Sequence, residues 1–166
     1  MGPYIKEGMT VLDFGCGPGY FTIDMAQMVG KAGTVIAADL QEGMLRKLAD
    51  KIRGTEVEGR ITLHKTGEDS IGVCAKVDFV LAFYVVHEVP DHGGFFKELQ
   101  STLRQGGLIL MVEPPLAVSK KAFESAVRIA EDAGFRLLQR PRVLFSKAAI
   151  LQNGKGGRLI DLPPCN

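Results

Sequence analysis

Residues 11–22 read VLDFGCGPGYFT, an apolar run that carries the carboxylate of Asp13 and ends in glycines at alternate positions. The run predicts a buried strand, and Gly15, Gly17 and Gly19 predict a tight turn into a helix. Glycine suits such a turn because it lacks a Cβ, so the chain can fold back sharply and a ligand can approach the backbone closely. The stretch therefore predicts a ligand site at the end of the first strand.

Two familiar glycine turns fit this stretch poorly. A dinucleotide-binding GxGxxG turn needs its third glycine where Tyr20 stands. A phosphate-binding GxxxxGK[ST] loop needs a lysine after the glycines, and the next lysine is Lys31. Asp13 would also repel a pyrophosphate at close range. The stretch favours a ligand with a cationic amino-acid end over a diphosphate.

Length and composition indicate one ordinary globular domain. The chain has 166 residues and a net charge of +1, so it offers little field to attract a polyanion, and we expect no nucleic-acid partner. Cys16, Cys74 and Cys165 share no CxxC spacing, which disfavours a disulfide framework or a zinc site. No apolar run approaches a span of about 20 residues and no secretory signal is recognisable. We expect a cytoplasmic protein with no membrane partner.

Apolar β-type runs alternate with stretches of helical periodicity along the chain. A uniformly apolar strand is expected where helices cover both faces of a parallel sheet. The pattern predicts an α/β, Rossmann-like, doubly wound and mostly parallel sheet with helices on both faces. The first five strands are expected at residues 9–14, 33–39, 60–65, 77–83 and 107–113, and the helical stretches include Phe21, Met25 and Met28, then Met44, Leu48 and Ile52, then Phe96, Leu99 and Leu103.

The C-terminal third predicts one more helix and two more strands. We expect the helix at 119–133 and the strands at 135–140 and 142–153. A link this short allows only an antiparallel pair, so the seventh and last strand should reverse at the edge of the sheet. Residues 1–153 would form a single domain, and residues 154–166, rich in glycine and proline, a loosely held tail.

The sequence VLDFGCGPG resembles the first motif of the class I S-adenosylmethionine-dependent methyltransferases, of the small-molecule, methyltransferase-11/31-like type. The resemblance covers about residues 5–140 in strand order and spacing. It implies methyl transfer with S-adenosylmethionine as cofactor. On the positions that match the family's motifs, it implies cofactor contacts at Asp13, Gly15, Cys16, Gly17, Gly19, Tyr20, Asp39, Leu40, Thr66, Gly67, Glu68, Ala82 and Phe83.

The acid after the second strand has the clearest implied role. In the family, the residue at Asp39 accepts the ribose hydroxyls and the next residue, Leu40, lies against the adenine. Asp39 could instead be a helix cap, and Leu40 an ordinary core leucine. The turn at 66–68 would adjoin the adenine edge, although many members carry an aspartate where Thr66 stands, and Glu68 could equally be a solvated loop charge.

The end of the fourth strand is expected to face the methionine part of the cofactor. Ala82 and Phe83 stand there, in the sequence AFYV. DNA amino-methylating enzymes usually read [DNS]PP[YFW] at this place, so base methylation is disfavoured. We expect a small-molecule acceptor.

His87 is the best-placed candidate base, since it follows the fourth strand on the acceptor side and histidine titrates near neutrality. Tyr84 and Glu88 are weaker candidates, and His87 could instead shape the pocket or cap the next helix. The sequence HEVPDH does not predict a metal site, because its histidines are five residues apart with Pro90 between them.

Only about eight residues precede the first strand, where family members commonly carry helices that cover the acceptor pocket. The lid should therefore be minimal and the pocket open, which fits a large acceptor, a partner, or a missing N-terminal extension. Two other functions stay open: a catalytically silent cofactor-binding subunit that needs a partner, and a nucleotide-dependent oxidoreductase.

Overall fold

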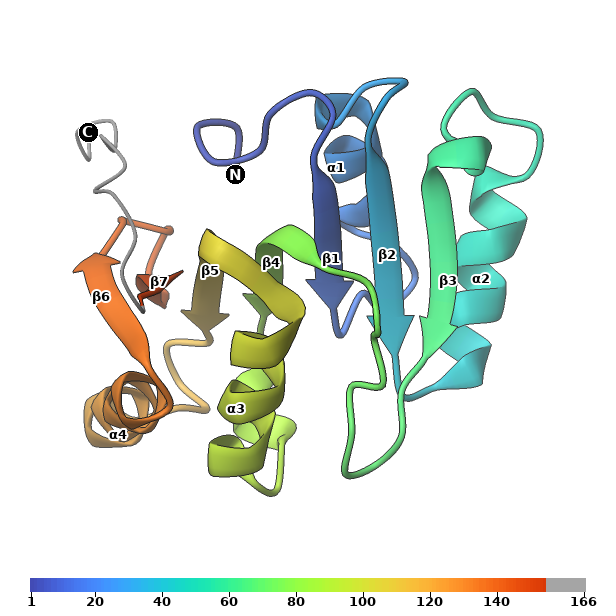
Figure 1. The fold of residues 1–166 in the computed structure, drawn as a ribbon. Helices are drawn as coiled ribbons and strands as arrows, with labels where there is room; N and C mark the ends of the chain where they lie inside the picture. The colour runs from blue at the N-terminus through green and yellow to red at the C-terminus, as the bar shows by residue number, and fades with distance from the viewer. Residues whose placement is uncertain (155–166) are drawn as a thin grey trace.

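The protein folds around a seven-stranded sheet in the order β3-β2-β1-β4-β5-β7-β6 (Figure 1). The computed structural model describes residues 1–154. The strands are β1 (Thr10–Phe14), β2 (Thr34–Asp39), β3 (Ile61–Lys65), β4 (Val77–Phe83), β5 (Leu103–Glu113), β6 (Phe135–Gln139) and β7 (Lys147–Asn153). The helices are α1 (Thr22–Met28), α2 (Glu42–Ile52), α3 (His92–Thr102) and α4 (Lys120–Asp132), with short 3-10 turns η1 (Glu58–Arg60) and η2 (Val86–Glu88).

Helices cover both faces of the sheet, as the uniformly apolar strands predict. On β2, Val35 packs in the cluster that contains α1 residues and Ala37 packs against α2, while Ile36 and Ala38 join the cluster on the opposite face. That opposite face is covered by α3 and α4. The expected doubly wound α/β architecture is confirmed.

The N-terminal residues also cover part of the sheet. Ile5 is 5% exposed and packs with the cluster over β4 and β5, and the Tyr4 ring stacks on Phe79 with centroids 6.4 Å apart. Met1, Tyr4 and Ile5 of this segment therefore contribute to the core.

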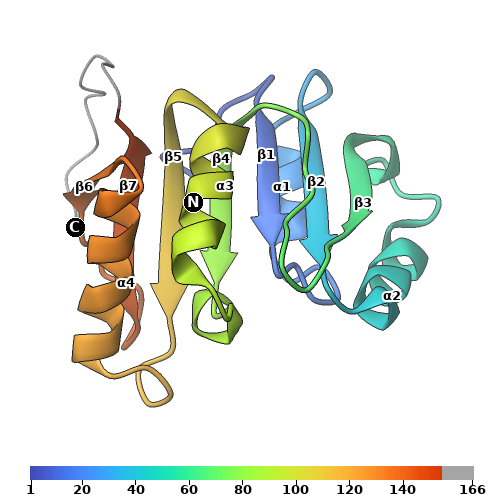
Figure 2. The same ribbon diagram turned by 60° about the horizontal axis from the view of Figure 1, so that its bottom comes forward.

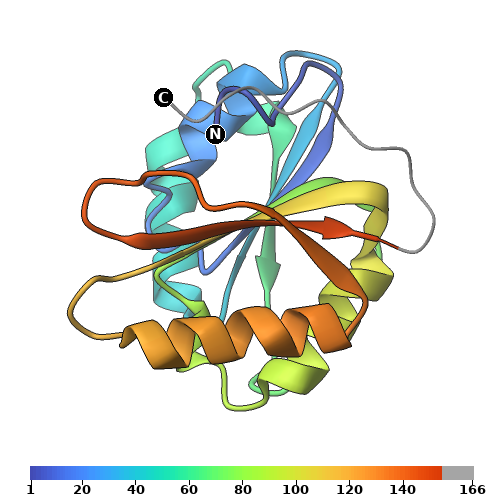
Figure 3. The same cartoon turned by 90° about the vertical axis from the view of Figure 1, so that its left-hand side faces the viewer.

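The prediction that the last, antiparallel strand lies at the edge of the sheet is wrong. β7 inserts between β5 and β6 and is antiparallel to both, so the edge strand is β6 (Figure 3). The reason is burial: four consecutive β7 residues, Ala148 to Leu151, are at most 5% exposed, whereas β6 is only partly buried. At the end of β7, the Asn153 side-chain amide donates to the carbonyls of Gln100 and Leu103 at 3.1 and 3.0 Å.

Several boundaries differ from the sequence prediction. Leu103, expected on the third periodic helix, is the first residue of β5, which pairs with β4 four residues earlier than predicted. Residues 142–146 form a turn in place of the start of the last strand, with a single bridge between Val143 and Ser146. The expected loose tail at 154–166 lies, apart from Gly154, outside the described residues.

The chain reverses direction across the sheet between β1 and β4. It builds outward from β1 to β3, and the segment between β3 and β4 then crosses over β1 and β2 to begin β4 on the other side of β1 (Figure 2). Ile71 and Val73 of this segment pack in the core cluster with Leu12 and Ile36. Such a reversal opens a crevice at the carboxyl ends of the strands, where ligands bind in open α/β sheets.

Candidate functional site

The glycine turn after β1 packs closely against its neighbours. Gly15 has φ +71° and Gly19 has φ +81°, conformations that residues with a Cβ rarely adopt. A Cβ on Gly15 would lie 2.5 Å from Val85 Cγ2, and one on Gly19 would lie 2.4 Å from Leu48 Cδ1. These two glycines are required by both conformation and space.

Asp39 ties this turn to the end of β2. Its Oδ2 accepts a hydrogen bond from the Gly17 amide at 2.8 Å, and its Oδ1 accepts one from the Gln41 amide at 2.8 Å. The helix-cap alternative for Asp39 is wrong, because the N-cap of α2 is Gln41, which has no side-chain cap. Each carboxylate oxygen has a second lone pair with which it can accept a ligand hydroxyl.

Asp13 lies beneath the turn rather than on its surface. It is 2% exposed, and its Oδ2 accepts a hydrogen bond from Thr22 Oγ1 at 2.6 Å. Burial, with a smaller contribution from Asp39, raises the pKa of Asp13 to about 6, although the Thr22 hydrogen bond opposes the shift. Asp13 can therefore act on a ligand through its charge but not by contact.

A cavity of about 610 Å³ opens at the switch point, within the range of small-ligand sites. Eight predicted residues line it: Gly15, Asp39, Leu40, Thr66, Gly67, Glu68, Tyr84 and Glu88. The first six come from the ends of β1, β2 and β3. Leu40 is 48% exposed, so it is not the core leucine of the alternative interpretation. The remaining wall includes Phe14, Gln41, Val85, Phe95 and Glu98.

The other predicted residues do not line this cavity. Cys16 is 4% exposed, and burial, aided by the charges of Asp13 and Asp39, raises the pKa of its thiol. Tyr20 is 75% exposed, so its ring projects from the turn into solvent. Ala82 is fully buried. The other predicted residues outside the lining are Asp13, Gly17, Gly19, Phe83 and His87.

Glu98 of α3, which the sequence analysis missed, organises one wall. Its carboxylate accepts hydrogen bonds from the amides of Ile71 and Gly72 at 2.9 and 2.7 Å, and from Ser70 Oγ at 2.9 Å. Burial raises the pKa of Glu98, but these three bonds outweigh it, and the net shift is downward. Nothing local in the sequence distinguishes Glu98 from a solvated helix residue, because its partners are 26 to 28 positions away.

Tyr84 closes the cavity at the end of β4. It has φ +58°, uncommon for a residue with a Cβ, and its amide donates to the Val112 carbonyl at 2.8 Å. Its hydroxyl is 2.6 Å from Ser146 Oγ, and its ring lies 4.3 Å from that of Phe83. The aromatic contact continues to Phe21 at 4.6 Å. Tyr84 is held from both ends, and its hydroxyl already has a partner.

His87 is held by a second residue that the sequence analysis missed. Its Nδ1 is 2.6 Å from Glu113 Oε2, and its amide donates to Glu113 Oε1 at 3.2 Å. Glu113 is 2% exposed, whereas the His87 side chain is 29% exposed. Burial raises the pKa of Glu113, and the His87 hydrogen bonds and charge partly oppose this. The only signal in the sequence was an acid that closes the apolar run of residues 108–112.

This pairing determines which nitrogen of His87 is available. A carboxylate only accepts hydrogen bonds, so Nδ1 carries the hydrogen and Nε2 is free to accept a proton. Val85 and Glu88, near His87 in the chain, line the cavity, although His87 itself does not. The arrangement can position a general base at the edge of the cavity.

Within residues 1–154, no group of three or more His, Cys, Asp or Glu side chains could hold a metal ion. Over the same part of the chain, every helix is too short or too polar to cross a membrane.

The sequence and the fold match known methyltransferases. A methyltransferase domain family matches residues 11–107, more than half of the chain. A solved SAM-dependent methyltransferase from Aquifex aeolicus superposes with a TM-score of 0.76 and 27% identity, over 89% of this chain and 83% of the other. The chain belongs to the class I S-adenosylmethionine-dependent methyltransferase family. S-adenosylmethionine is the cofactor of this family.

Two curated relatives are named for quinone biosynthesis. The demethylmenaquinone methyltransferase of Lactococcus lactis is 30% identical over 120 residues, which are 70% of this chain and 48% of that protein. A ubiquinone/menaquinone biosynthesis C-methyltransferase of Haemophilus ducreyi is 26% identical over 137 residues, which are 82% of this chain and 51% of that protein. The chain spans about half the length of these curated relatives.

Replacing Asp13 should change how stability depends on pH. Its pKa is raised from 3.8 to about 6, so the stability it contributes is present below pH 3.8 and is lost as pH rises through 6. Compared with Asp13→Asn, the free energy of unfolding of the wild type should fall by up to about 3 kcal/mol between pH 4 and 7. Urea unfolding at a series of pH values measures this. The exposed Asp24→Asn is the control, and a pH-independent difference for Asp13→Asn would contradict the assignment.

Replacing Glu98 should loosen the wall that it organises. Glu98→Gln removes the charge from three hydrogen bonds, so S-adenosylhomocysteine should bind about tenfold more weakly. Hydrogen exchange at the Ile71 and Gly72 amides should accelerate. Titration calorimetry and exchange mass spectrometry measure the two effects. Glu131→Gln, on the exposed side of α4, should leave both unchanged, and unaltered exchange in Glu98→Gln would show that the wall does not depend on this carboxylate.

Proposed function

We propose that the protein binds S-adenosylmethionine in the cavity at the switch point and transfers its methyl group to a small-molecule acceptor. The observation that carries the proposal is the junction of Asp39 with the glycine turn, which places a carboxylate and an accessible backbone at one end of a 610 Å³ cavity. Family membership supplies the cofactor class.

The residues present fit this cofactor. Asp39 has acceptor positions left for ribose hydroxyls, and the half-exposed Leu40 offers an apolar surface for the adenine. The open backbone at Gly17 suits the amino-acid end, and the buried Asp13 adds negative charge that favours a cationic ligand. When bound, the cofactor supplies an electrophilic methyl group on a positively charged sulfur.

His87 is proposed as the base that receives the acceptor's proton. Its free Nε2 takes the proton from an O–H, N–H, S–H or acidified C–H while that atom forms its bond to the methyl group. The bound cofactor would supply the methyl group, and its sulfur would take the electron pair of the broken bond. Glu113 acts as a positioning residue: it holds Nδ1 and compensates the charge that His87 gains. Holding the partners in line supplies much of the rate.

The relatives' names favour an aromatic acceptor methylated at carbon, since both are named for quinones and one is named a C-methyltransferase. The apolar walls of the cavity, including Phe14, Val85 and Phe95, would suit an aromatic ring. A hydroxyl beside the reacting carbon would give His87 a proton to remove.

Ligand binding should distinguish the proposed methyltransferase from a nucleotide-dependent oxidoreductase. Titration calorimetry should show S-adenosylhomocysteine binding and no binding of NADH. Asp39→Asn should lower the affinity for S-adenosylhomocysteine at least tenfold, because the hydrogen bonds that the charged carboxylate accepts are lost or weakened. Asp132→Asn, exposed at the end of α4, should not change affinity. NADH binding that displaces S-adenosylhomocysteine would contradict the proposed cofactor.

Turnover should separate an enzyme from a silent cofactor-binding subunit. A screen of phenolic and quinol acceptors with methyl-labelled cofactor should give labelled product. On the acceptor so found, His87→Ala should lower kcat at least a hundredfold, with S-adenosylhomocysteine affinity within a few-fold of the wild type. Added imidazole should restore part of the loss.

Glu113→Gln should lower kcat about tenfold with little change in KM. Glu124→Gln, which removes only the surface ion pair with Arg140, is its control. A kcat unaffected by His87→Ala would eliminate this base. Tight cofactor binding with no methyl release to any acceptor would favour the silent subunit.

A further inference from the structure

The most exposed large apolar side chains of residues 1–154 gather on two loops. Leu116 is 98% exposed, Leu144 90% and Phe145 83%. Leu116 lies between β5 and α4, and the other two lie between β6 and β7. Single exposed leucines are ordinary, but several on adjoining loops mark an interaction surface.

The two loops are fixed beside each other. Glu113 at the end of β5 pairs with Lys147 at the start of β7, so the loops leave neighbouring strands at the same level. Lys147 Nζ donates to the Pro115 carbonyl at 3.0 Å, which joins one loop to the other. Figure 3 shows both loops on the same side of the molecule, beside the beginning of α4.

Leu144 and Phe145 occupy the tip of a formed turn. The Ser146 amide donates to the Val143 carbonyl at 2.8 Å, which closes a four-residue turn with the two apolar residues at its centre. Leu144 has φ +42°, a conformation that glycine or asparagine would adopt more readily. Leu144 is strained in this conformation and projects outward. Neither the formation of the turn nor packing in the core explains a leucine at this position.

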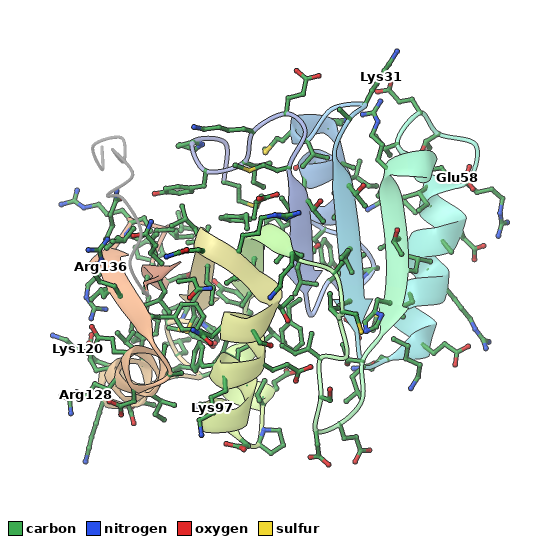
Figure 4. The ribbon with its side chains drawn as sticks, in the orientation of Figure 1. Lys31, Glu58, Lys97, Lys120, Arg128 and Arg136 are labelled. Carbon is green, nitrogen blue, oxygen red and sulfur yellow. The ribbon has the colours of Figure 1, made fainter. Side chains whose placement is uncertain are left out.

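The surface around these side chains is basic. Residues 114–123 and 140–147 contain Lys120, Lys121, Arg140, Arg142 and Lys147 and no acidic residue. Arg140 pairs with Glu124, and the Lys120 side chain extends from α4 into solvent (Figure 4). The whole chain has a net charge of only +1, so this positive charge is local.

We propose that the loops at 114–119 and 140–146, with the first turn of α4, dock on an anionic lipid bilayer. Leu116, Leu144 and Phe145 enter the headgroup region, while Lys120, Lys121 and Arg142 contact lipid phosphates. The expectation of no membrane partner rests on the lack of an apolar run long enough to span a bilayer, and surface docking does not need such a run. Ser146, at the base of the turn, contacts Tyr84, so this docking surface adjoins the candidate site.

Vesicle binding tests both parts of this surface. The full chain should co-sediment with phosphatidylcholine vesicles that contain phosphatidylglycerol, at least tenfold more tightly than with phosphatidylcholine alone. Leu144→Asn with Phe145→Ser should weaken binding at least tenfold, and asparagine tolerates the positive φ. Lys120→Gln, Lys121→Gln and Arg142→Gln together should do the same. Lys31→Gln, Lys47→Gln and Lys51→Gln, an equal loss of charge elsewhere, should leave binding within about twofold.

Insertion can be read from a single tryptophan, because the chain has none. The emission of Phe145→Trp should shift to shorter wavelength on anionic vesicles and be quenched by brominated lipid. Leu63→Trp, on β3 at the other edge of the sheet, should show neither change. Circular dichroism and S-adenosylhomocysteine binding check that each variant folds.

Three results would overturn the proposal. The first is equal binding of the wild type and both surface variants. The second is vesicle binding without quenching of Phe145→Trp. The third is a dimer, found by sedimentation velocity, that Leu144→Asn with Phe145→Ser dissociates while no vesicle binding occurs, since a second copy would then cover this surface. None of these measurements depends on methyl transfer.

Discussion

The candidate site depends on two hydrogen bonds to one carboxylate. Asp39 accepts the amide of Gly17 from the turn after β1 and the amide of Gln41 from the turn after β2. The turn has no side chain at Gly15 or Gly17, so the neighbouring strand holds it: Asp39 acts together with the Ala38 carbonyl, which accepts the Gly15 and Cys16 amides at 2.8 and 3.1 Å. Because β1 and β2 are parallel and Phe14 pairs with Ala38, Asp39 at the end of β2 lies level with this turn. The same carboxylate therefore holds the turn and faces the cavity.

The carboxylates around the site have pKa values shifted in different directions, because burial raises the pKa and hydrogen-bond donors lower it. Asp13 is deeply buried with one side-chain donor, and its pKa rises. Glu98 is less buried and accepts three hydrogen bonds, and its pKa falls. Glu113 is buried and paired with His87, and its pKa is raised. The depth of burial, weighed against the donors that reach each group, decides the direction of the pKa shift, and sequence alone gives neither.

The sequence predicted what is local and periodic. Five parallel strands, the glycine turn and Asp39 follow from apolar runs and from residues adjacent in the chain, and the structure confirms the architecture. The insertion of β7 between β5 and β6 depends on which strands bury best together, which no local pattern shows. Glu98 and Glu113 were missed because their partners lie 26 to 28 residues away. The site roles of Tyr84 and His87 stay predictions.

The position of β7 has a consequence for how the chain is made on the ribosome. Within residues 1–154, β6 pairs only with β7, and the outer edge of β5 stays unpaired until β7 forms. Until residue 153 has emerged, both strands present unpaired backbone, and the carbonyls at Gln100 and Leu103 lack the Asn153 amide. The sheet is therefore complete only after residue 153 has emerged, and a nascent chain stopped before residue 147 has a ready template for pairing with another chain.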